Sequence, residues 1–286
     1  MKPAKFDYFA PGTLDEALEL LAQHGPDAKV LAGGQSLMPM MNLRLVRPTV
    51  VVDINRIEGL SGISASDGTI TIGALTRQRE LERSEAIRTA FPMMTAAISH
   101  IGHFQIRNRG TIGGSLAHAD PAAELPAVCT ALDAEFILAD GNDAQAIPAS
   151  EFAIAPLITS LAPEQLLTEV RLPALGAGWR WGFREVSRRE GDFALVGSLA
   201  MLRTDDDGVC REARITMFAV GDGPARMPAA EQSLVGRVVD DGARREAAAL
   251  VSEAVTPGSD IHASSEYRKE VSAVMARRAL EDACST

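Results

Sequence analysis

The organisation of this chain is decided by two short stretches, Ala32-Gly33-Gly34-Gln35-Ser36 and Thr111-Ile112-Gly113-Gly114-Ser115. Each pairs two glycines with small hydroxyl or amide side chains. Because glycine has no Cβ, the backbone of such a stretch can turn sharply and bring its N–H groups close to a ligand. Successive N–H groups in a turn form a concavity that suits an anion. Two stretches of this kind predict two loops that close on one phosphate-rich cofactor.

The residues before the first stretch predict a helix and then a short buried strand. Thr13 can cap the helix, and Glu16 completes a capping box three residues later. Gly25 and Pro26 end the helix. The apolar run at 28–31 then reads as a strand that leads directly into the first glycine loop, which is a favourable position for a cofactor loop.

A hairpin and a helical block separate the two stretches. Asp67-Gly68 between the apolar runs 63–65 and 69–72 is a strong hairpin signal. Helical sequence follows at 76–99, interrupted at Pro92. After the second stretch, Asp120 is placed either to cap a helix that begins at Pro121 or to contact the cofactor, and both interpretations stay open.

The remainder of the chain changes character after residues 173–178, the best candidate linker. Before this linker the sequence predicts strands at 134–139, 144–147 and 166–172, with a turn at 140–143. After it, strands are predicted at 180–186, 194–202 and 214–220, and helices at 229–235, 241–254 and 265–282. Strands followed by helices are typical of an α+β domain.

Composition and charge exclude several classes of protein. The 286 residues carry a formal net charge of −10, which argues against a nucleic-acid binder because such proteins use Lys and Arg to displace phosphate counterions. We find no secretory signal and no apolar stretch long enough for a membrane span, so the cytoplasm is the expected compartment. The 3 cysteines cannot hold an iron–sulfur cluster alone, since that usually takes four thiolates.

Familiar nucleotide and catalytic motifs are missing. Neither glycine stretch spells the Rossmann pattern, and the sequence contains no P-loop and no serine nucleophile elbow. His100, His103 and His118 lack an acidic or cysteine partner at a recognised metal-binding spacing, so ordinary loop histidines are the better interpretation and no metal site is expected. The glycine stretches are therefore interpreted as a diphosphate cradle of a non-Rossmann type.

Several segments resemble one family. The stretch 30–47 with Val51-Asp53-Ile54, the stretch 101–124 and the stretch 187–193 closely resemble the medium, FAD-binding subunit of the molybdenum hydroxylases, which include carbon monoxide, xanthine, nicotine and caffeine dehydrogenases. The resemblance extends to residues 262–268 and so covers essentially the whole chain. It implies an α+β fold: a two-part FAD-binding domain of the vanillyl-alcohol-oxidase (PCMH) type in residues 1–175, then a smaller α+β domain in residues 176–286.

The resemblance also implies which residues contact FAD. The first segment would wrap the diphosphate, the second would contact the same region, an acid would hold a ribose or ring edge, and an adjoining turn would lie near the isoalloxazine. The residues that wrap the diphosphate would be Val30, Leu31, Ala32, Gly33, Gly34, Gln35, Ser36 and Leu37, and those of the second segment Thr111, Gly113, Gly114 and Ser115. The acid would be Glu124 or Asp120, and the turn near the isoalloxazine Ile101 and Gly102. Leu167 and Arg184 occupy two further positions that resemble cofactor contacts of the family.

Phe193 departs from the family pattern, because several relatives carry Tyr or Trp at this position. The ring can stack on the flavin but cannot donate a hydrogen bond, and a core phenylalanine is the alternative.

The function that the resemblance implies is electron transfer rather than acid–base catalysis on this chain, since the flavin carries the chemistry. Substrate would be oxidised at a molybdopterin cofactor on a large partner subunit. Electrons would pass through [2Fe-2S] clusters on a small subunit and leave through FAD to an external acceptor. The alternatives are a stand-alone flavin reductase of the same FAD fold and a cofactor-free scaffold or binding module.

Overall fold

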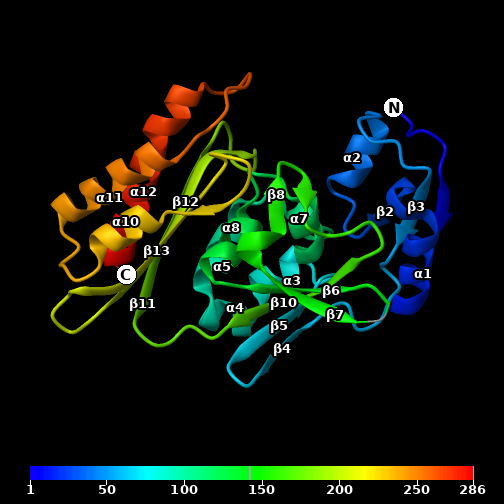
Figure 1. Cartoon of the computed structure of the whole chain (residues 1–286), viewed down its shortest axis with the longest axis horizontal. Coiled ribbons are helices and arrows are strands. Elements are labelled where there is room, and N and C mark those ends of the chain that lie inside the picture. Colours follow the sequence, from blue (N-terminus) through cyan, green and yellow to red (C-terminus); the bar gives the residue numbers. More distant parts are fainter. Residues whose placement is uncertain (142, 286) are drawn as a thin grey trace.

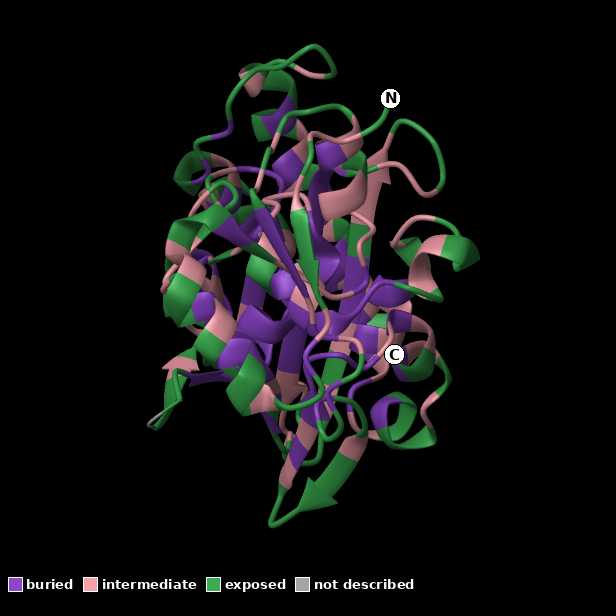
Figure 2. Ribbon diagram, turned by 90° about the vertical axis from the view of Figure 1, so that its right-hand side faces the viewer, coloured by how far each residue is buried: buried purple, intermediate pink, exposed green. Residues whose placement is uncertain are grey.

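The computed structural model describes residues 1–141 and 143–285, in which the chain forms three units in a row (Figure 1). Asn142 of the predicted 140–143 turn and Thr286 lie outside the described residues. In Figure 1 the blue N-terminal unit lies at one end, a sheet with its helices occupies the centre, and the yellow-to-red C-terminal unit lies at the other end. Buried residues run through the middle of the molecule, and exposed residues gather at its rim (Figure 2).

The N-terminal unit is a small parallel sheet, in the order β1-β3-β2, with one covering helix. Its elements are β1 (Asp7–Phe9), α1 (Leu14–His24), a 3-10 turn (Gly25–Asp27), β2 (Ala28–Leu31), α2 (Leu37–Asn42) and β3 (Val50–Asp53). The predicted capping box is confirmed, because the Glu16 N–H donates to Thr13 Oγ1 at 3.2 Å and the Thr13 N–H donates to the Glu16 side chain. Ala17, Leu18 and Leu21 of α1 then pack on the strands.

The central unit is an antiparallel sheet in the order β4-β5-β10-β6-β7, with helices against one side. The predicted hairpin is confirmed, with Asp67 and Gly68 at positive φ in its turn. The elements are β4 (Ile63–Ser66), β5 (Thr69–Gly73), α3 (Gln78–Arg83), α4 (Glu85–Ala90), α5 (Pro92–His100), α6 (Phe104–Arg107), α7 (Ile112–His118), α8 (Glu124–Ala131), β6 (Glu135–Ala139), β7 (Ala144–Pro148), α9 (Ala149–Phe152), β8 (Ala153–Ala155), β9 (Ile158–Thr159) and β10 (Leu166–Pro173).

The C-terminal unit places an antiparallel sheet, β11-β12-β13-β14, between two layers of helices. Helix α12 covers β11 and β12 on one face, while α5 and α8 of the central unit pack on the other. Phe183, Leu199 and Phe218 therefore belong to the same apolar core as the central unit. The elements are β11 (Trp179–Ser187), β12 (Ala194–Thr204), β13 (Cys210–Phe218), β14 (Ala225–Arg226), α10 (Pro228–Leu234), α11 (Asp241–Ala254) and α12 (Ser265–Ser285).

The predicted α+β architecture is confirmed, with two parts before residue 175 and strands followed by helices after it. Three local predictions differ from the structure. The helical block 76–99 breaks at Pro92 as predicted, where α5 starts, but it also breaks at Ser84, whose hydroxyl caps α4, and so forms three helices. Asp120 does not cap α8, whose N-cap is Ala123; its Oδ1 accepts from the Ala122 N–H at 2.9 Å in the preceding turn. The strand predicted at 214–220 begins earlier, at Cys210.

The second glycine stretch was also assigned incorrectly, because it is the first turn of a helix rather than a loop. Thr111 is the N-cap of α7, and its Oγ1 accepts from the Gly114 N–H at 3.1 Å. A threonine cap at this position supplies an acceptor that the first turn otherwise lacks.

The described helices include none with the length and apolar character that a membrane crossing requires. Cys129, Cys210 and Cys284 are free thiols, and the first two are buried.

Candidate functional site

The segment after β2 offers a row of free backbone donors. The chain leaves the sheet at Leu31 and turns at Gly34, which has φ +73° and lies in the left-handed region that glycine favours. Among the described residues, no acceptor receives a hydrogen bond from the N–H groups of residues 33–37. The Gln35 side chain donates to the Gly33 carbonyl at 2.9 Å and so braces the turn from within. Residues 33–37, which we call the donor loop, thus form a concavity suited to an anion.

The donor loop lies directly against the segment that leads into α7. A Cβ at Gly33 would stand 2.4 Å from the Arg109 carbonyl oxygen and 2.9 Å from Gly110 Cα, distances that no side chain tolerates. A Cβ at Gly114 would stand 3.7 Å from the Ala32 Cβ. The structure therefore brings the two glycine stretches together, and Gly33 is required by the packing of backbone on backbone.

The start of α7 differs from the donor loop because its N–H groups are already used. Ile112 donates to the Thr76 carbonyl and Gly113 to the Ala74 carbonyl, while Gly114 and Ser115 donate to the Thr111 hydroxyl and carbonyl. The expectation that both glycine stretches present open backbone donors is thus wrong for the second. What α7 can offer a ligand is the Ser115 hydroxyl and the close approach that Gly114 permits.

A polar brace that the sequence analysis missed joins the two segments. Arg77 donates to the Arg109 carbonyl at 2.6 Å and to Asn55 Oδ1 at 2.7 Å. Asn55 donates to the Ala32 carbonyl at 2.8 Å and to Asp53 Oδ1 at 2.6 Å. Burial alone would raise the pKa of Asp53, but hydrogen bonds from Tyr8 and Asn55 lower it below its ordinary value. The only sequence signal was the pair Asp53 and Asn55, which lie at the end of the buried strand β3 and just beyond it.

A second part of the site lies where Ile101 and Gly102 meet the loop 187–193. A Cβ at Gly191 would stand 3.1 Å from His103 Cε1 and 3.2 Å from the Gly102 carbonyl oxygen, so the two turns are in contact. Phe193 at the end of this loop is 69% exposed. The core alternative for Phe193 is therefore wrong, and the ring is free to cover a bound group.

Acidic side chains are buried beside these turns. Glu124 begins α8 and is 7% exposed. Burial, and after it the charges of Glu185 and Asp120, raises the pKa of Glu124 to about 8. The hydrogen bond with Glu185 raises the pKa of His100, whose Nδ1 lies 3.5 Å from Glu185 Oε1.

Two predicted site residues are not brought to this cluster as side chains. Leu167 is 3% exposed, and its side chain belongs to the main apolar core together with Ile112 and Leu116 of α7. The Arg184 guanidinium donates two hydrogen bonds to Asp282 of α12, at 2.6 and 2.8 Å. Because side chains alternate along a strand, Arg184 lies on the opposite face of β11 from Phe183 and Glu185. Its position corrects the expectation of a cofactor contact from this side chain.

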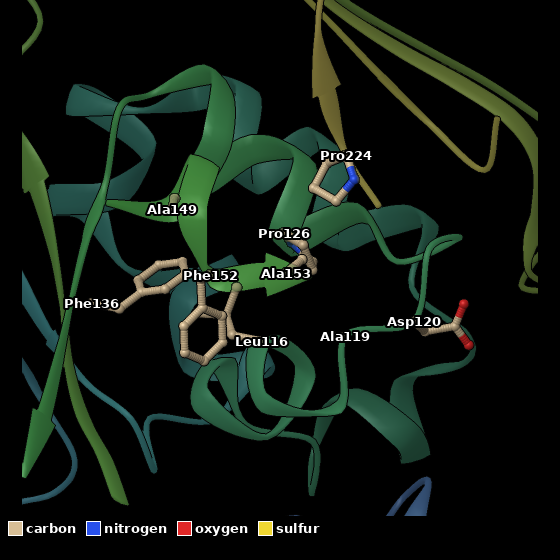
Figure 3. Close-up of a pocket in the computed structure, with 9 residues that line it drawn as sticks. All are labelled: Leu116, Ala119, Asp120, Pro126, Phe136, Ala149, Phe152, Ala153 and Pro224. Atoms are coloured by element: carbon tan, nitrogen blue, oxygen red, sulfur yellow. The ribbon is translucent and has the colours of Figure 1, made fainter. Parts of the chain in front are cut away.

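The pocket in Figure 3 is a packing feature beside the site. Phe136, Phe152 and Leu116 line it, and the Asp120 carboxylate points away from the two rings. An apolar lining of this kind gives a ligand no polar group that would orient it. Within residues 1–141 and 143–285 no three His, Cys, Asp or Glu side chains converge as metal ligands.

The described residues fit a flavin dinucleotide. The donor loop supplies five free N–H groups in sequence, from Gly33 to Leu37, for a diphosphate. The exposed Phe193 ring and the turn at Ile101 and Gly102 supply an apolar face for a ring system.

Comparison with known families matches both halves of the chain. Residues 4–175 match a family model described as the FAD binding domain in molybdopterin dehydrogenase. Residues 181–283 match one described as the CO dehydrogenase flavoprotein C-terminal domain.

Individual relatives match over nearly their full length. The 6-hydroxypseudooxynicotine dehydrogenase complex subunit alpha of Paenarthrobacter nicotinovorans is 43% identical over 99% of this chain and 96% of its own. The carbon monoxide dehydrogenase medium chain of Hydrogenophaga pseudoflava is 35% identical over 99% of this chain and 98% of its own.

Solved structures agree with the sequence comparisons. Carbon monoxide dehydrogenase from Hydrogenophaga pseudoflava, in a form that lacks the Mo-pyranopterin moiety of the molybdenum cofactor, superposes with a TM-score of 0.97 at 36% identity, covering 100% of this chain and 99% of that one. Quinoline 2-oxidoreductase from Pseudomonas putida 86 gives a TM-score of 0.95 at 35% identity, with coverage of 100% and 99%.

Proposed function

The chain belongs to the family of FAD-binding medium subunits of the molybdenum hydroxylases, and we propose that it holds FAD at the donor loop and passes electrons out of a larger assembly. The observation that carries this proposal is the run of unused N–H groups in residues 33–37, packed against the start of α7. Such a run of N–H groups suits an anion, and in an FAD domain that anion is the diphosphate of the cofactor. The flavin, when bound, supplies the two-electron and one-electron chemistry.

Each part of the site has a separate task in this proposal. The donor loop binds the diphosphate, Gly114 allows its close approach and Ser115 offers a hydroxyl. Ile101, Gly102 and Phe193 face the ring system and exclude water from one side of it, and Glu124 or Asp120 holds a ribose or ring edge. The polar brace of Asp53, Asn55 and Arg77 fixes the distance between the two glycine stretches. The full set of proposed FAD contacts is Val30, Leu31, Ala32, Gly33, Gly34, Gln35, Ser36, Leu37, Ile101, Gly102, Thr111, Gly113, Gly114, Ser115, Asp120, Glu124, Leu167 and Phe193.

We propose that this chain works with a large subunit that carries a molybdopterin cofactor and a small subunit that carries [2Fe-2S] clusters. The names of these relatives, "complex subunit alpha" and "medium chain", support a role within an assembly rather than a stand-alone flavin reductase. The few and isolated thiols of this chain agree with iron–sulfur clusters being held elsewhere.

Two further proposals concern organisation and location. We place the domain boundary between residues 175 and 176, because residues 174–178 form no helix or strand and lie between β10 and β11. We assign the chain to the cytoplasm on the basis of its free cysteines, since thiols persist in reducing compartments.

Purification from the native host tests the function. We expect FAD bound to this chain, together with molybdenum and iron on chains that copurify with it. A chain that purifies alone, holds FAD and turns over a small substrate without partners would favour the stand-alone reductase. A native chain that takes up no flavin after reconstitution with FAD would favour the scaffold.

A further inference from the structure

The turn at Ile101 and Gly102 is held by a single guanidinium group. Arg107 Nη1 donates to the Ile101 carbonyl and to the Gly102 carbonyl, each at 3.0 Å. Gly102 has φ +46°, the left-handed backbone that glycine favours, and both carbonyl groups of the turn face the same side chain. Hydrogen bonds from a charged donor are about twice as strong as those between neutral groups, so these two bonds fix the turn.

Helix α3 holds the Arg107 side chain in place. Arg107 Nε donates to Glu82 Oε2 at 3.3 Å, and the side chains of the two residues are 12% and 16% exposed. Glu82 Oε2 also accepts from Arg79 at 2.6 Å. A guanidinium with so little exposure is tolerated because a carboxylate pairs with its charge. Its planar fork also lets one side chain bond to a carboxylate and to backbone carbonyls at the same time.

The same helix holds the other end of the segment 101–110. Arg77, the N-cap residue of α3, donates to the Arg109 carbonyl at 2.6 Å, and the Gln78 N–H donates to the Gly110 carbonyl at 2.9 Å. Gly110 is in turn one of the two residues against which Gly33 packs. The start of α3 therefore fixes the segment beside the donor loop, and its last turn fixes the segment at residues 101–102.

The Gly102 carbonyl oxygen also meets the loop that carries Phe193. A Cβ at Gly191 would stand 3.2 Å from this oxygen, so the loop 187–193 rests on the atom that Arg107 orients. The direction of this carbonyl thus affects both surfaces proposed for the flavin ring, which are the turn at 101–102 and Phe193.

We propose that Arg107 is a positioning residue for the flavin ring: held by Glu82, it orients the turn at Ile101 and Gly102 against which the ring of bound FAD lies. The proposal rests on the FAD function proposed above, and it gives roles to Arg107 and Glu82, which lie outside the proposed contact set. Arg107 acts through the two carbonyl groups and needs no contact with FAD itself.

The first test measures hydrogen–deuterium exchange of the protein without FAD. Arg107→Met removes the donor to both carbonyl groups, so we expect faster exchange in peptides that cover residues 98–108 and 187–193 and wild-type exchange in α11. Arg79→Met is the matched control, because it removes the other donor to Glu82 and leaves the bonds to the turn in place. Unchanged exchange at residues 98–108 in Arg107→Met, or equally fast exchange there in Arg79→Met, overturns the proposal.

The second test measures the FAD dissociation constant, and then iodide quenching of flavin fluorescence at saturating FAD. In Arg107→Met we expect the dissociation constant to rise at least about tenfold, the equivalent of one hydrogen bond to a charged group, and the quenching constant to rise with it. Arg107→Lys keeps a charged donor without the planar fork and should lie between Arg107→Met and the wild type. Arg79→Met should match the wild type in both values.

Glu82→Gln provides a milder perturbation, which decides the matter if Arg107→Met does not fold. It leaves the guanidinium in place but weakens its hold, so both values should shift in the same direction by a smaller amount. A purely structural role would lower the melting temperature of the variants and leave the quenching constant at saturating FAD unchanged, and that result overturns the proposal. A wild-type protein that binds no FAD would instead contradict the proposed function, and this proposal with it, whereas the other failures leave that function standing.

Discussion

Replacing Gly33 with alanine is the sharpest perturbation of the site, because one methyl group meets only backbone. The new Cβ would stand 2.4 Å from the Arg109 carbonyl oxygen and 3.1 Å from its carbon. The two segments must move apart by about 1 Å to restore ordinary contact, and overpacking of this kind costs about 1–3 kcal/mol. If the donor loop moves, that cost falls on cofactor binding as a loss of about 5- to 150-fold in affinity.

The assay is titration of the apoprotein with FAD, followed by flavin fluorescence, with thermal unfolding of the apoprotein measured in parallel. Gly176→Ala is the control, because its Cβ would meet nothing within 4 Å and the residue has no positive φ. We expect Gly33→Ala to bind FAD more weakly than the control at a similar or slightly lower melting temperature. Wild-type FAD affinity in a folded Gly33→Ala protein would refute the reasoning, since the donor loop would then not depend on its contact with residues 109–110.

Three further predictions concern the brace, the buried acid and the exposed ring. Arg77→Met leaves the Arg109 carbonyl and Asn55 Oδ1 without their donor, so chemical denaturation should show a loss of about 1–3 kcal/mol, while the surface variant Arg171→Met should show almost none. The pKa of Glu124 is raised, so the folded state holds the carboxyl proton more firmly than the unfolded state does. The stability that this proton contributes is fully present below the pKa of an unfolded glutamate and is lost as pH rises toward about 8. The stability of Glu124→Gln relative to wild type should therefore grow from about pH 5 to about pH 8 and level off above it, and a constant difference would count against a buried, neutral Glu124. Phe193→Ala should weaken FAD binding about 2- to 10-fold and make flavin fluorescence more accessible to iodide quenching, whereas unchanged quenching would mean that the ring does not cover the flavin.

The sequence predicted those features that short-range chemistry determines. Thr13 with Glu16 marked a helix start, and Asp67-Gly68 marked a hairpin, because in each case neighbouring residues supply the hydrogen bonds or the backbone angles. The α+β fold and the proximity of the two glycine stretches followed from local pattern together with the chain-long resemblance.

The features that were missed depend on contacts between distant segments. Whether a glycine-rich stretch has free N–H groups depends on acceptors elsewhere, and the Ala74 and Thr76 carbonyls use those of Gly113 and Ile112. Arg184 was assigned to the cofactor from the resemblance, whereas its face of β11 and its partner Asp282 are set by the packing of α12, which local sequence does not reveal. The burial of Glu185 against His100 likewise arises only when β11 packs on α5.

The central claim is that residues 33–37 hold the diphosphate of FAD through their backbone. Hydrogen–deuterium exchange of the chain with and without FAD tests it directly, because the amides of the donor loop have no acceptor in the described structure, whereas those of residues 112–115 are already bonded. We predict strong FAD-dependent protection in peptides that cover residues 33–37 and little change at residues 112–115. Protection confined to residues 112–115, or no protection at the donor loop when FAD is bound, would contradict the account.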